Sequence, residues 1–416
     1  MDFDLFGNFL DFLEKSYPHI HEKCNKDIVS GYSPVFHWKG KNGDLKPILL
    51  IGHYDVVPVE KSTLKDWEVE PFEGLIKDGY IWGRGTLDNK NQVISVMEAI
   101  DHLIATTYIP NRDIYFAFGY DEEIGGARGA KKISEYFKAK GIEFECVLDE
   151  GGAIIQGMME GLKKPAALIG VAEKGSTNIR ISVKGQGGHS SMPPSSTAIA
   201  SLAEIVDNVN KNPMNSRLTE PVKEMFTSMA PHMKGKTFFL KNIETLFPII
   251  KNVLAKNPVT NSLIRTTIAF TMTGGGDAPN VLPQNAWAIA NLRILQGDSI
   301  DSTIEHIRRV NTNYKLKIEK LLTEEPSIIS NLNSPAYKIL KSTIRNIYPD
   351  VLIMPYLMSG ATDSRHYYSI CKNIYRFMAV NVSQEDFNSI HSNNEKISFD
   401  NLRNLINFYI RLIKAF

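Results

Sequence analysis

Three adjacent acids stand out in this sequence, in the stretch FGYDEEIGG. Asp121, Glu122 and Glu123 follow directly on the apolar run DIYFAF. Because like charges repel, such a cluster is costly unless a cation lies among the carboxylates. The chemistry to expect is therefore that of a bound metal ion, and the question is which other residues help to hold it.

Further metal-binding residue types follow apolar runs or lie in polar turns elsewhere in the chain. They are His53 and Asp55 after ILLIG, Asp88 in WGRGTLDNK, Asp149 and Glu150 after CVL, and His391 in SIHSNNE. Ligands bind where the strands of an open α/β sheet emerge, so residues that follow such strands can meet at one edge.

Two imidazoles with several carboxylates form the ligand set that zinc prefers when no thiolate is present, and a carboxylate can bridge two ions. A pair of metal ions can activate a water molecule and hold the oxyanion that its attack creates. Within Glu122-Glu123, one carboxylate can bind metal while its neighbour serves as the general base. Gly125 and Gly126 allow the sharp turn that this arrangement needs.

Each of these motifs also has an ordinary structural explanation. A single histidine is more often a packed or surface side chain than a ligand, and Asp-Glu-Glu is usually a solvated turn. The combination, with most of the pieces at strand ends, is what favours a metal site over these explanations.

The elements that must position these residues alternate along the first half of the chain. Residues 47–52, 113–118 and 144–150 have the apolar runs of buried strands, and residues 91–105 and 130–141 have helical spacing. The order strand, helix, strand, helix, strand predicts an α/β fold with a largely parallel sheet flanked by helices.

The pattern changes after residue 173. STNIRISVKG alternates strictly, with Ile179, Ile181 and Val183 on one face, as expected of a half-exposed antiparallel strand. We therefore predict a catalytic domain formed by residues 1–173 and 326–416, with a separate α+β domain inserted at 174–325. No motif assigns the segment from about residue 213 to 258.

Composition restricts the class of protein. With 416 residues, two domains are expected. A net charge of +1 does not indicate binding to nucleic acid or to an anionic membrane. A membrane-spanning helix needs a run of about 18 apolar residues, and this sequence has none. The N-terminus lacks the pattern of a secretory signal, and three cysteines without metal-like spacing favour a reducing compartment. A cytoplasmic protein is the expectation.

The motifs, taken in order, resemble those of the di-zinc metallopeptidases that include carboxypeptidase S, the aminoacylases, glutamate carboxypeptidase and succinyl-diaminopimelate desuccinylase. They are GHYDVVPV, WGRGTLDNK, DEEIGG, LDEGG, GQGGHSS, NVLP, GATDSR and IHSNNE, and they extend over nearly the whole chain. LDEGG, GQGGHSSMPP and GATDSR are most similar to the carboxypeptidase S branch, which also includes hydrolases of N-fatty-acyl amino acids.

This resemblance implies roles for the residues of the site. Two zinc ions per chain are expected, with cobalt or manganese as alternatives. The implied ligands are His53, Asp88 as the bridge, Glu123, one of Asp149 and Glu150 with Glu150 favoured, and His391. Asp55 would orient His53, and Glu122 would be the general base.

The resemblance also implies that the inserted domain is a lid that dimerises, so a homodimer is expected. His189 would reach the active site and stabilise the oxyanion. The residues implied to contact the substrate are Asn280, Arg293, Gly360, Thr362 and Arg365. The chain departs from the pattern at Asp277-Ala278-Pro279 and at Gln296, which weakens the transfer of substrate specificity.

The predicted activity is hydrolysis of the amide next to a free C-terminal amino acid, in N-blocked dipeptides or N-acyl amino acids. The alternatives are a dipeptidase acting on free dipeptides and a non-catalytic binding protein that keeps the fold. A di-metal phosphoesterase is disfavoured because no basic cluster awaits a phosphate.

Overall fold

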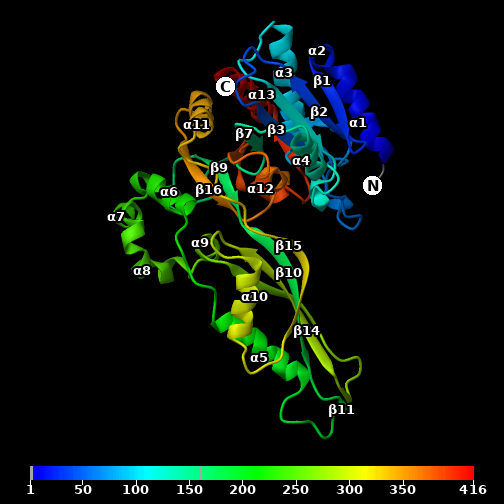
Figure 1. Ribbon diagram of the computed structural model, residues 1–416, viewed down its shortest axis with the longest axis vertical. Helices are drawn as coiled ribbons and strands as arrows, with labels where there is room; N and C mark the ends of the chain where they lie inside the picture. Colours follow the sequence, from blue (N-terminus) through cyan, green and yellow to red (C-terminus); the bar gives the residue numbers. More distant parts are fainter. Residues whose placement is uncertain (1–2, 160) are drawn as a thin grey trace.

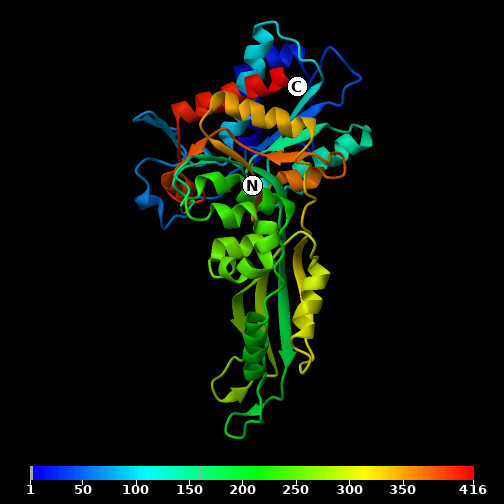
Figure 2. The ribbon, with the colours of Figure 1, turned by 90° about the vertical axis from the view of Figure 1, so that its left-hand side faces the viewer.

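The computed structural model describes residues 3–159 and 161–416 and has two parts of different shape. A broad body contains both ends of the described chain, and a narrow sheet with helices extends away from it (Figure 1). The view turned by 90° shows the same division (Figure 2). No helix in the described ranges is long and apolar enough to cross a membrane.

The body is built on a ten-stranded sheet whose centre is parallel. Strand β3 (Ile48–His53) lies between β6 (Ile114–Gly119) and β7 (Cys146–Asp149) and is parallel to both. Strand β17 (Ile374–Arg376) is parallel to β7, and β16 (Leu352–Met358) is parallel to β9 (Ala166–Glu173). At one edge, β1 (Asn25–Val29) and β2 (Ser33–Trp38) run antiparallel. The predicted α/β fold with a mostly parallel sheet is confirmed.

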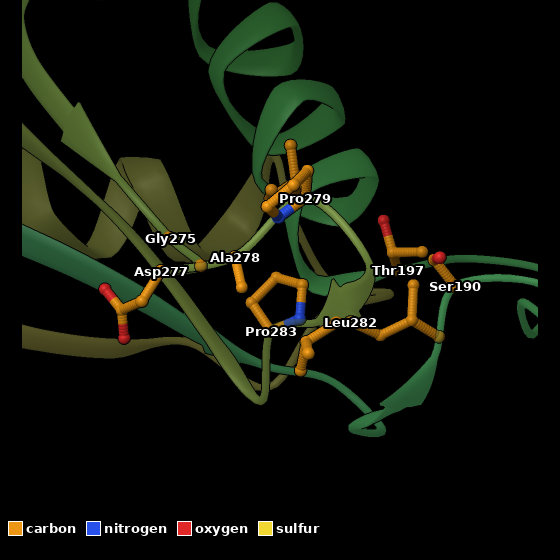
Figure 3. A pocket seen from close by; sticks show the side chains of 11 residues that line it. Ser190, Thr197, Gly275, Asp277, Ala278, Pro279, Leu282 and Pro283 are labelled. Atoms are coloured by element: carbon orange, nitrogen blue, oxygen red, sulfur yellow. The ribbon is translucent and has the colours of Figure 1, made fainter.

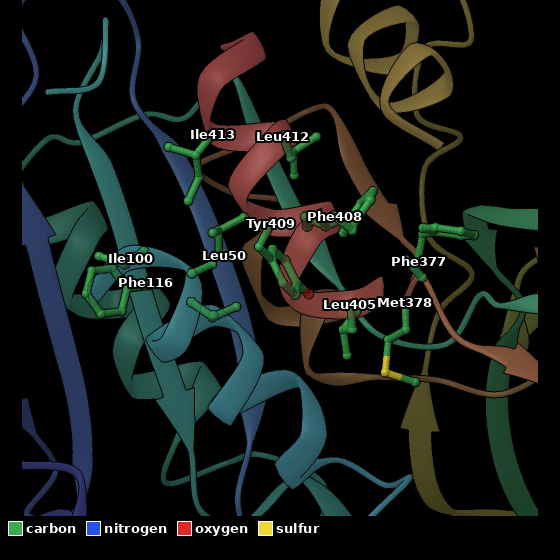
Figure 4. Close-up of a cluster of buried hydrophobic side chains, with 14 of the residues drawn as sticks. Leu50, Ile100, Phe116, Phe377, Met378, Leu405, Phe408, Tyr409, Leu412 and Ile413 are labelled. Carbon is green, nitrogen blue, oxygen red and sulfur yellow. The ribbon is translucent and has the colours of Figure 1, made fainter. Parts of the chain in front are cut away.

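Helices cover both faces of this sheet, which explains why its central strands are continuously apolar. Leu50 faces a core formed with α3 (Lys90–Ala105) and α13 (Phe399–Ala415), including Ile100 and Phe408 (Figure 4). Leu49, its neighbour in the strand, faces the opposite core, which contains Phe137 of α4 (Ala130–Ala139). Successive residues of a strand point to opposite faces of the sheet. A continuous apolar run is therefore expected only in a strand whose two faces are both buried.

The narrow part is a four-stranded antiparallel sheet in the order β12-β14-β10-β15. Its strands are β10 (Gly175–Lys184), β12 (Thr267–Gly274), β14 (Asn285–Ile294) and β15 (Lys317–Glu324). Helices α5 (Ala198–Lys211) and α10 (Ile300–Arg309) contribute to the core on one face, where Ile179, Ile181 and Val183 are buried as their alternation predicts. We call this part the lid; its strands fall within the predicted range 174–325.

The segment without a motif and the residues that directly follow it form four α-helices that pack on the body. They are α6 (Glu220–Met229), α7 (Thr237–Lys241), α8 (Ile243–Leu254) and α9 (Pro258–Ile264). Val222 and Phe226 of α6 share a core with Leu168 of β9 and with Met354 and Leu357 of β16. Although these helices lie inside the range 174–325 in sequence, their apolar residues therefore extend the body and not the four-stranded sheet.

Candidate metal centre

The polar residues singled out in the sequence meet at the carboxyl edge of the parallel strands. His53 is the last residue of β3, Asp149 is the last residue of β7, and Glu150 follows it. The acids after β6 form a short turn, η2 (Glu122–Ile124). Because β3 lies between β6 and β7, their carboxyl ends converge there.

Two groups of potential ligands share one carboxylate. In the first, Nε2 of His53 lies 3.1 Å from Oδ1 of Asp88 and 3.0 Å from Oε1 of Glu150. In the second, Nε2 of His391 lies 2.9 Å from Oδ2 of Asp88 and 3.3 Å from Oε2 of Glu123. The ligand atoms within each group lie within 4.8 Å of one another. Asp88 thus offers one oxygen to each group, as a carboxylate that bridges two cations must.

The chemistry of these side chains fits a divalent cation at each group. Histidine nitrogens and carboxylate oxygens are the ligands that zinc takes in sites without cysteine. Oε1 of Glu123 is buried and has no hydrogen-bond partner among the described residues. A buried unpaired carboxylate oxygen is costly, and a nearby cation would remove that cost.

Asp55 positions the first histidine and the acidic turn together. Its Oδ1 lies 3.3 Å from Nδ1 of His53, on the side of the ring away from the other ligands. The same carboxylate accepts hydrogen bonds from the backbone N–H groups of Glu122 and Glu123, both at 3.1 Å. Gly125, at φ +105°, lets the chain turn immediately afterwards, as the sequence predicts.

The protonation of these acids reflects their burial and crowding. Burial raises the pKa of Glu122 to about 10; the positive charge of His53 lowers it, whereas the negative charges of Glu150 and Asp363 raise it further. Burial likewise raises the pKa of Glu150 to about 7. The hydrogen bonds that the His391 ring donates to the carboxylates of Asp88 and Glu123 raise the pKa of His391 to about 10. A bound cation would supply the positive charge that favours the ionised form of these buried carboxylates.

One residue that the sequence analysis left without a role, Glu395, ties the two ligand loops together. Its side chain is fully buried and pairs with Arg84 at 2.7 Å. It also accepts hydrogen bonds from the backbone N–H groups of Gly85 at 3.0 Å, Leu87 at 2.7 Å and Asp88 at 3.1 Å. Glu395 belongs to the same SIHSNNE motif as His391, and that shared motif is the signal that could have identified it.

Asp149 is buried but does not join either ligand group in the part of the chain that the structure describes. Its Oδ2 accepts a hydrogen bond of 2.9 Å from the backbone N–H of Ser364. Of the two acids that the sequence left as alternatives, Glu150 is therefore the one whose carboxylate reaches His53.

The loop that contains GATDSR is held at the junction of body and lid. Thr362 donates through its N–H and its hydroxyl to Oε1 of Glu173, at 2.7 and 3.0 Å. Glu173 also pairs with the buried Arg376 at 2.8 Å. Asp363, which the sequence analysis missed, has both carboxylate oxygens buried and without a hydrogen-bond partner among the described residues.

Residues implied to bind the substrate carboxylate divide into two places. Arg293 of β14 donates to the carbonyl of Ser359 at 3.3 Å, next to the exposed Gly360, and Arg365 pairs with Glu324 of the lid at 3.3 Å. These residues line the junction of body and lid, whereas Thr362 is buried beside it.

His189 and Asn280 lie elsewhere, toward the outer end of the lid. His189 is in β11 (Gly188–His189), which the view places at the opposite end of the molecule from β3 and β7 (Figure 1). The backbone of Asn280 accepts a hydrogen bond from Ser190, beside an open pocket of about 480 Å³ lined by residues of the loop 275–283 (Figure 3). Within one chain, the structure does not bring these two residues to the ligand groups.

A mostly parallel α/β sheet with two carboxylate–histidine groups at its carboxyl edge, joined to a smaller antiparallel lid, defines the class as a metal-dependent hydrolase. The sequence profile of peptidase family M20/M25/M40 matches residues 49–415, and the chain belongs to this family. The resemblance found in the motifs is confirmed.

Curated relatives support the same assignment. Probable carboxypeptidase S-like 2 of Dictyostelium discoideum is 40% identical over 98% of this chain and 79% of its own. N-fatty-acyl-amino acid synthase/hydrolase PM20D1 of Mus musculus is 34% identical over 98% and 82%. Carboxypeptidase S of Saccharomyces cerevisiae is 31% identical over 93% and 74%.

Solved structures support the fold. The M20 family metallo-carboxypeptidase Sso-CP2 from Sulfolobus solfataricus matches with a TM-score of 0.68 at 19% identity, covering 98% of this chain and 93% of that one. At this level of identity, the match extends to the arrangement of the elements and not to the substrate.

Proposed function

We propose that the chain binds two zinc ions and hydrolyses the amide bond next to a free C-terminal amino acid, in N-blocked dipeptides or N-acyl amino acids. The observation that carries this proposal is the sharing of Asp88 between two ligand groups, with Glu122 held beside them. The residues that would hold the metal are His53, Asp88 and Glu150 for one ion and Asp88, Glu123 and His391 for the other. Cobalt and manganese remain alternatives to zinc.

When bound, the metal pair would polarise the substrate carbonyl and lower the pKa of a water molecule. The protein itself has to move the proton. Glu122 would accept it from the attacking water and return it to the leaving amide nitrogen. Its backbone N–H is fixed by Asp55, so its position is tied to that of His53. This coupling supports its assignment as the general base.

The free carboxylate of the substrate would be recognised at the junction of body and lid. Arg293 and Arg365 come from different parts of the chain and lie there with their guanidinium groups partly exposed. Guanidinium groups suit a carboxylate because they can donate two parallel hydrogen bonds. The names of the relatives, carboxypeptidase S and N-fatty-acyl-amino acid synthase/hydrolase, support substrates with this end group.

A homodimer through the lid is part of the proposal. Strand β12 is an edge of the lid sheet, and a groove of about 470 Å³ between it and α5 is lined by Leu202, Phe270 and Met272. An exposed edge strand beside an apolar groove is suited to pairing with a second copy. Because His189 and Asn280 lie far from the ligand groups of their own chain, they would act on the site of the partner subunit.

The test is a panel of N-blocked dipeptides, N-acyl amino acids and free dipeptides, run on metal-stripped protein with and without added zinc. We expect zinc-dependent release of the C-terminal amino acid from the blocked substrates. The matched control is Glu122→Ala, which should keep two zinc ions by elemental analysis while losing turnover. Activity confined to free dipeptides would move the assignment to a dipeptidase. Bound zinc without turnover on any substrate would favour a binding protein.

A further inference from the structure

The helices that pack on the side of the body leave large apolar side chains in solvent. Five such side chains lie between residues 238 and 259 and are at least half exposed: Phe238 at 67%, Phe239 at 50%, Ile249 at 73%, Val253 at 65% and Val259 at 69%. We refer to residues 237–264, which form α7, α8 and α9, as the α7–α9 surface. Single exposed apolar residues need no explanation, but such a concentration marks an interaction site.

Helix α8 shows that this exposure is not a by-product of packing on the body. One stripe of the helix, formed by Ile243, Phe247, Ile250 and Leu254, packs into the core shared with β9 and β16. Ile249 and Val253 are one helical turn apart and face away from that core. Packing on the body needs only the first stripe, so the second has another use.

The charge of this segment is mostly positive. Lys241, Lys251 and Lys256 lie in the α7–α9 surface, and Lys234 and Lys236 lie directly before it, so that five lysines fall within 23 residues of a chain whose net charge is +1. The only acid between residues 234 and 256 is Glu244, and it pairs with Lys223 of α6 at 3.1 Å. In the part of the chain that the structure describes, none of the five lysines forms an ion pair with a carboxylate. Their charge is therefore free to attract an anionic partner.

The surface projects from the molecule and is attached to the junction of body and lid. Figures 1 and 2 show α6, α7 and α8 on one side of the molecule, where the lid meets the body. At the end of α9, the carbonyl groups of Ser262 and Arg265 each accept a hydrogen bond of 2.8 Å from Nζ of Lys174. Lys174 directly precedes β10, the first strand of the lid. A partner that binds α7–α9 would therefore be held next to the entrance to the proposed substrate site.

We propose that the α7–α9 surface docks the protein on an anionic lipid bilayer. Helices that present exposed aromatic and aliphatic side chains together with unpaired lysines bind at the interface of a membrane, with the apolar groups inserted and the cations near the headgroups. Each lysine close to an anionic leaflet adds attraction that salt weakens. A second protein chain would need carboxylates that match five lysines, whereas an anionic leaflet provides negative charge everywhere along the surface.

This docking site agrees with the proposed substrates but does not depend on them. An N-acyl amino acid with a long acyl chain partitions into bilayers, so an enzyme held there would find it at high local concentration. Membrane binding itself needs no turnover. The experiment below can therefore be run on the inactive Glu122→Ala protein, and its failure is separate from any failure of the proposed hydrolysis.

The test is cosedimentation of the full chain with vesicles of phosphatidylcholine alone and with vesicles in which part of the phosphatidylcholine is replaced by the anionic lipid phosphatidylserine. We expect binding only to the anionic vesicles, weakened by high salt. Phe238→Ser/Phe239→Ser and Ile249→Ser/Val253→Ser should each reduce the affinity about tenfold or more, since each removes two inserted side chains. Lys234→Glu/Lys236→Glu should reduce it and flatten the salt dependence.

The matched control is Leu5→Ser, because Leu5 is 63% exposed on α1 (Phe3–Ser16), away from this surface. All variants alter exposed positions, so their thermal unfolding and zinc content should equal those of the parent. The proposal is overturned if the parent binds neither type of vesicle, or if the α7–α9 variants bind as well as Leu5→Ser. It is also overturned if light scattering shows that the α7–α9 variants disrupt a dimer, since the surface would then be an interface between copies.

Discussion

Glu395→Gln is the substitution that best tests how the metal loops are built. The wild-type carboxylate is fully buried and faces the Arg84 guanidinium and three backbone N–H groups. Glutamine has nearly the same shape but offers a single acceptor oxygen. Its NH2 group would face N–H donors, with which it cannot form hydrogen bonds. In the variant, the buried Arg84 guanidinium would lose the negative charge of Glu395 that it pairs with in the wild type.

The magnitude follows from this geometry. Removing one partner of a buried ion pair costs about 3–5 kcal/mol, because the remaining charge stays desolvated. With an unfolding entropy of about 2.1 cal/mol/K per residue, a 416-residue chain that unfolds cooperatively has about 0.9 kcal/mol/K. The melting temperature should therefore fall by about 3–6 °C. Because Glu395 also fixes the N–H of Asp88 and shares a loop with His391, zinc affinity should fall about 10- to 100-fold.

The assay is differential scanning fluorimetry together with competition for zinc against a chelator of known affinity. Glu385→Gln is the matched control, since Glu385 pairs with Lys396 but is 79% exposed, and such a pair contributes about 0–1 kcal/mol. Our account of the loops is wrong if Glu395→Gln melts and binds zinc like this control. A loss of stability with normal zinc affinity would mean that Glu395 serves the fold and not the ligands.

Three further predictions address catalysis, pH and the core. Glu122→Gln should lower kcat by about 10²–10⁴ with zinc content unchanged, and a variant with near-normal kcat would refute its role as base. Burial, followed by the charge of Arg293, lowers the pKa of Lys174 to about 8. The unfolded chain then binds more protons between pH 8 and about 10.5, so stability should rise with pH in that window. Lys174→Met should flatten this rise in denaturant titrations, and an unchanged slope would contradict the assignment. Phe408→Ala should cost about 3–5 kcal/mol in the same titrations, whereas Phe387→Ala, at 55% exposure, should cost far less.

The sequence alone predicted the elements near the candidate site and most of the side chains that the structure brings together there. Continuous apolar runs such as Ile48–Ile51 require burial on both faces, and that condition implies helices on each side of a parallel sheet. The residues that follow parallel, adjacent strands lie at one edge of the sheet. The proximity of His53, Glu123 and Glu150 could therefore be predicted from the position of each residue at the end of its own strand. Strict alternation likewise predicted the buried face of β10.

Other features were decided only by the tertiary structure. Only the family resemblance favoured Glu150 over Asp149, because the direction in which each of two adjacent side chains points depends on the path of the chain after β7. Glu395 was missed because a buried carboxylate is recognised by its donors, which lie more than 300 positions away in the sequence. The packing of the helices in the unassigned segment could not be predicted either. Helix α8 is apolar on two faces, and its sequence pattern does not show which face packs on the body.

The position of His189 shows the same limit most clearly. Its Gly-Gly-His motif singles out the loop, but the sequence carries no information on how far a ten-residue strand extends the lid from the body. Residue types and local periodicity determine which groups can do chemistry and which element each group lies on. Distances between elements depend on packing and on the orientation of one part of the chain against another, and these are set by contacts between residues far apart in the sequence.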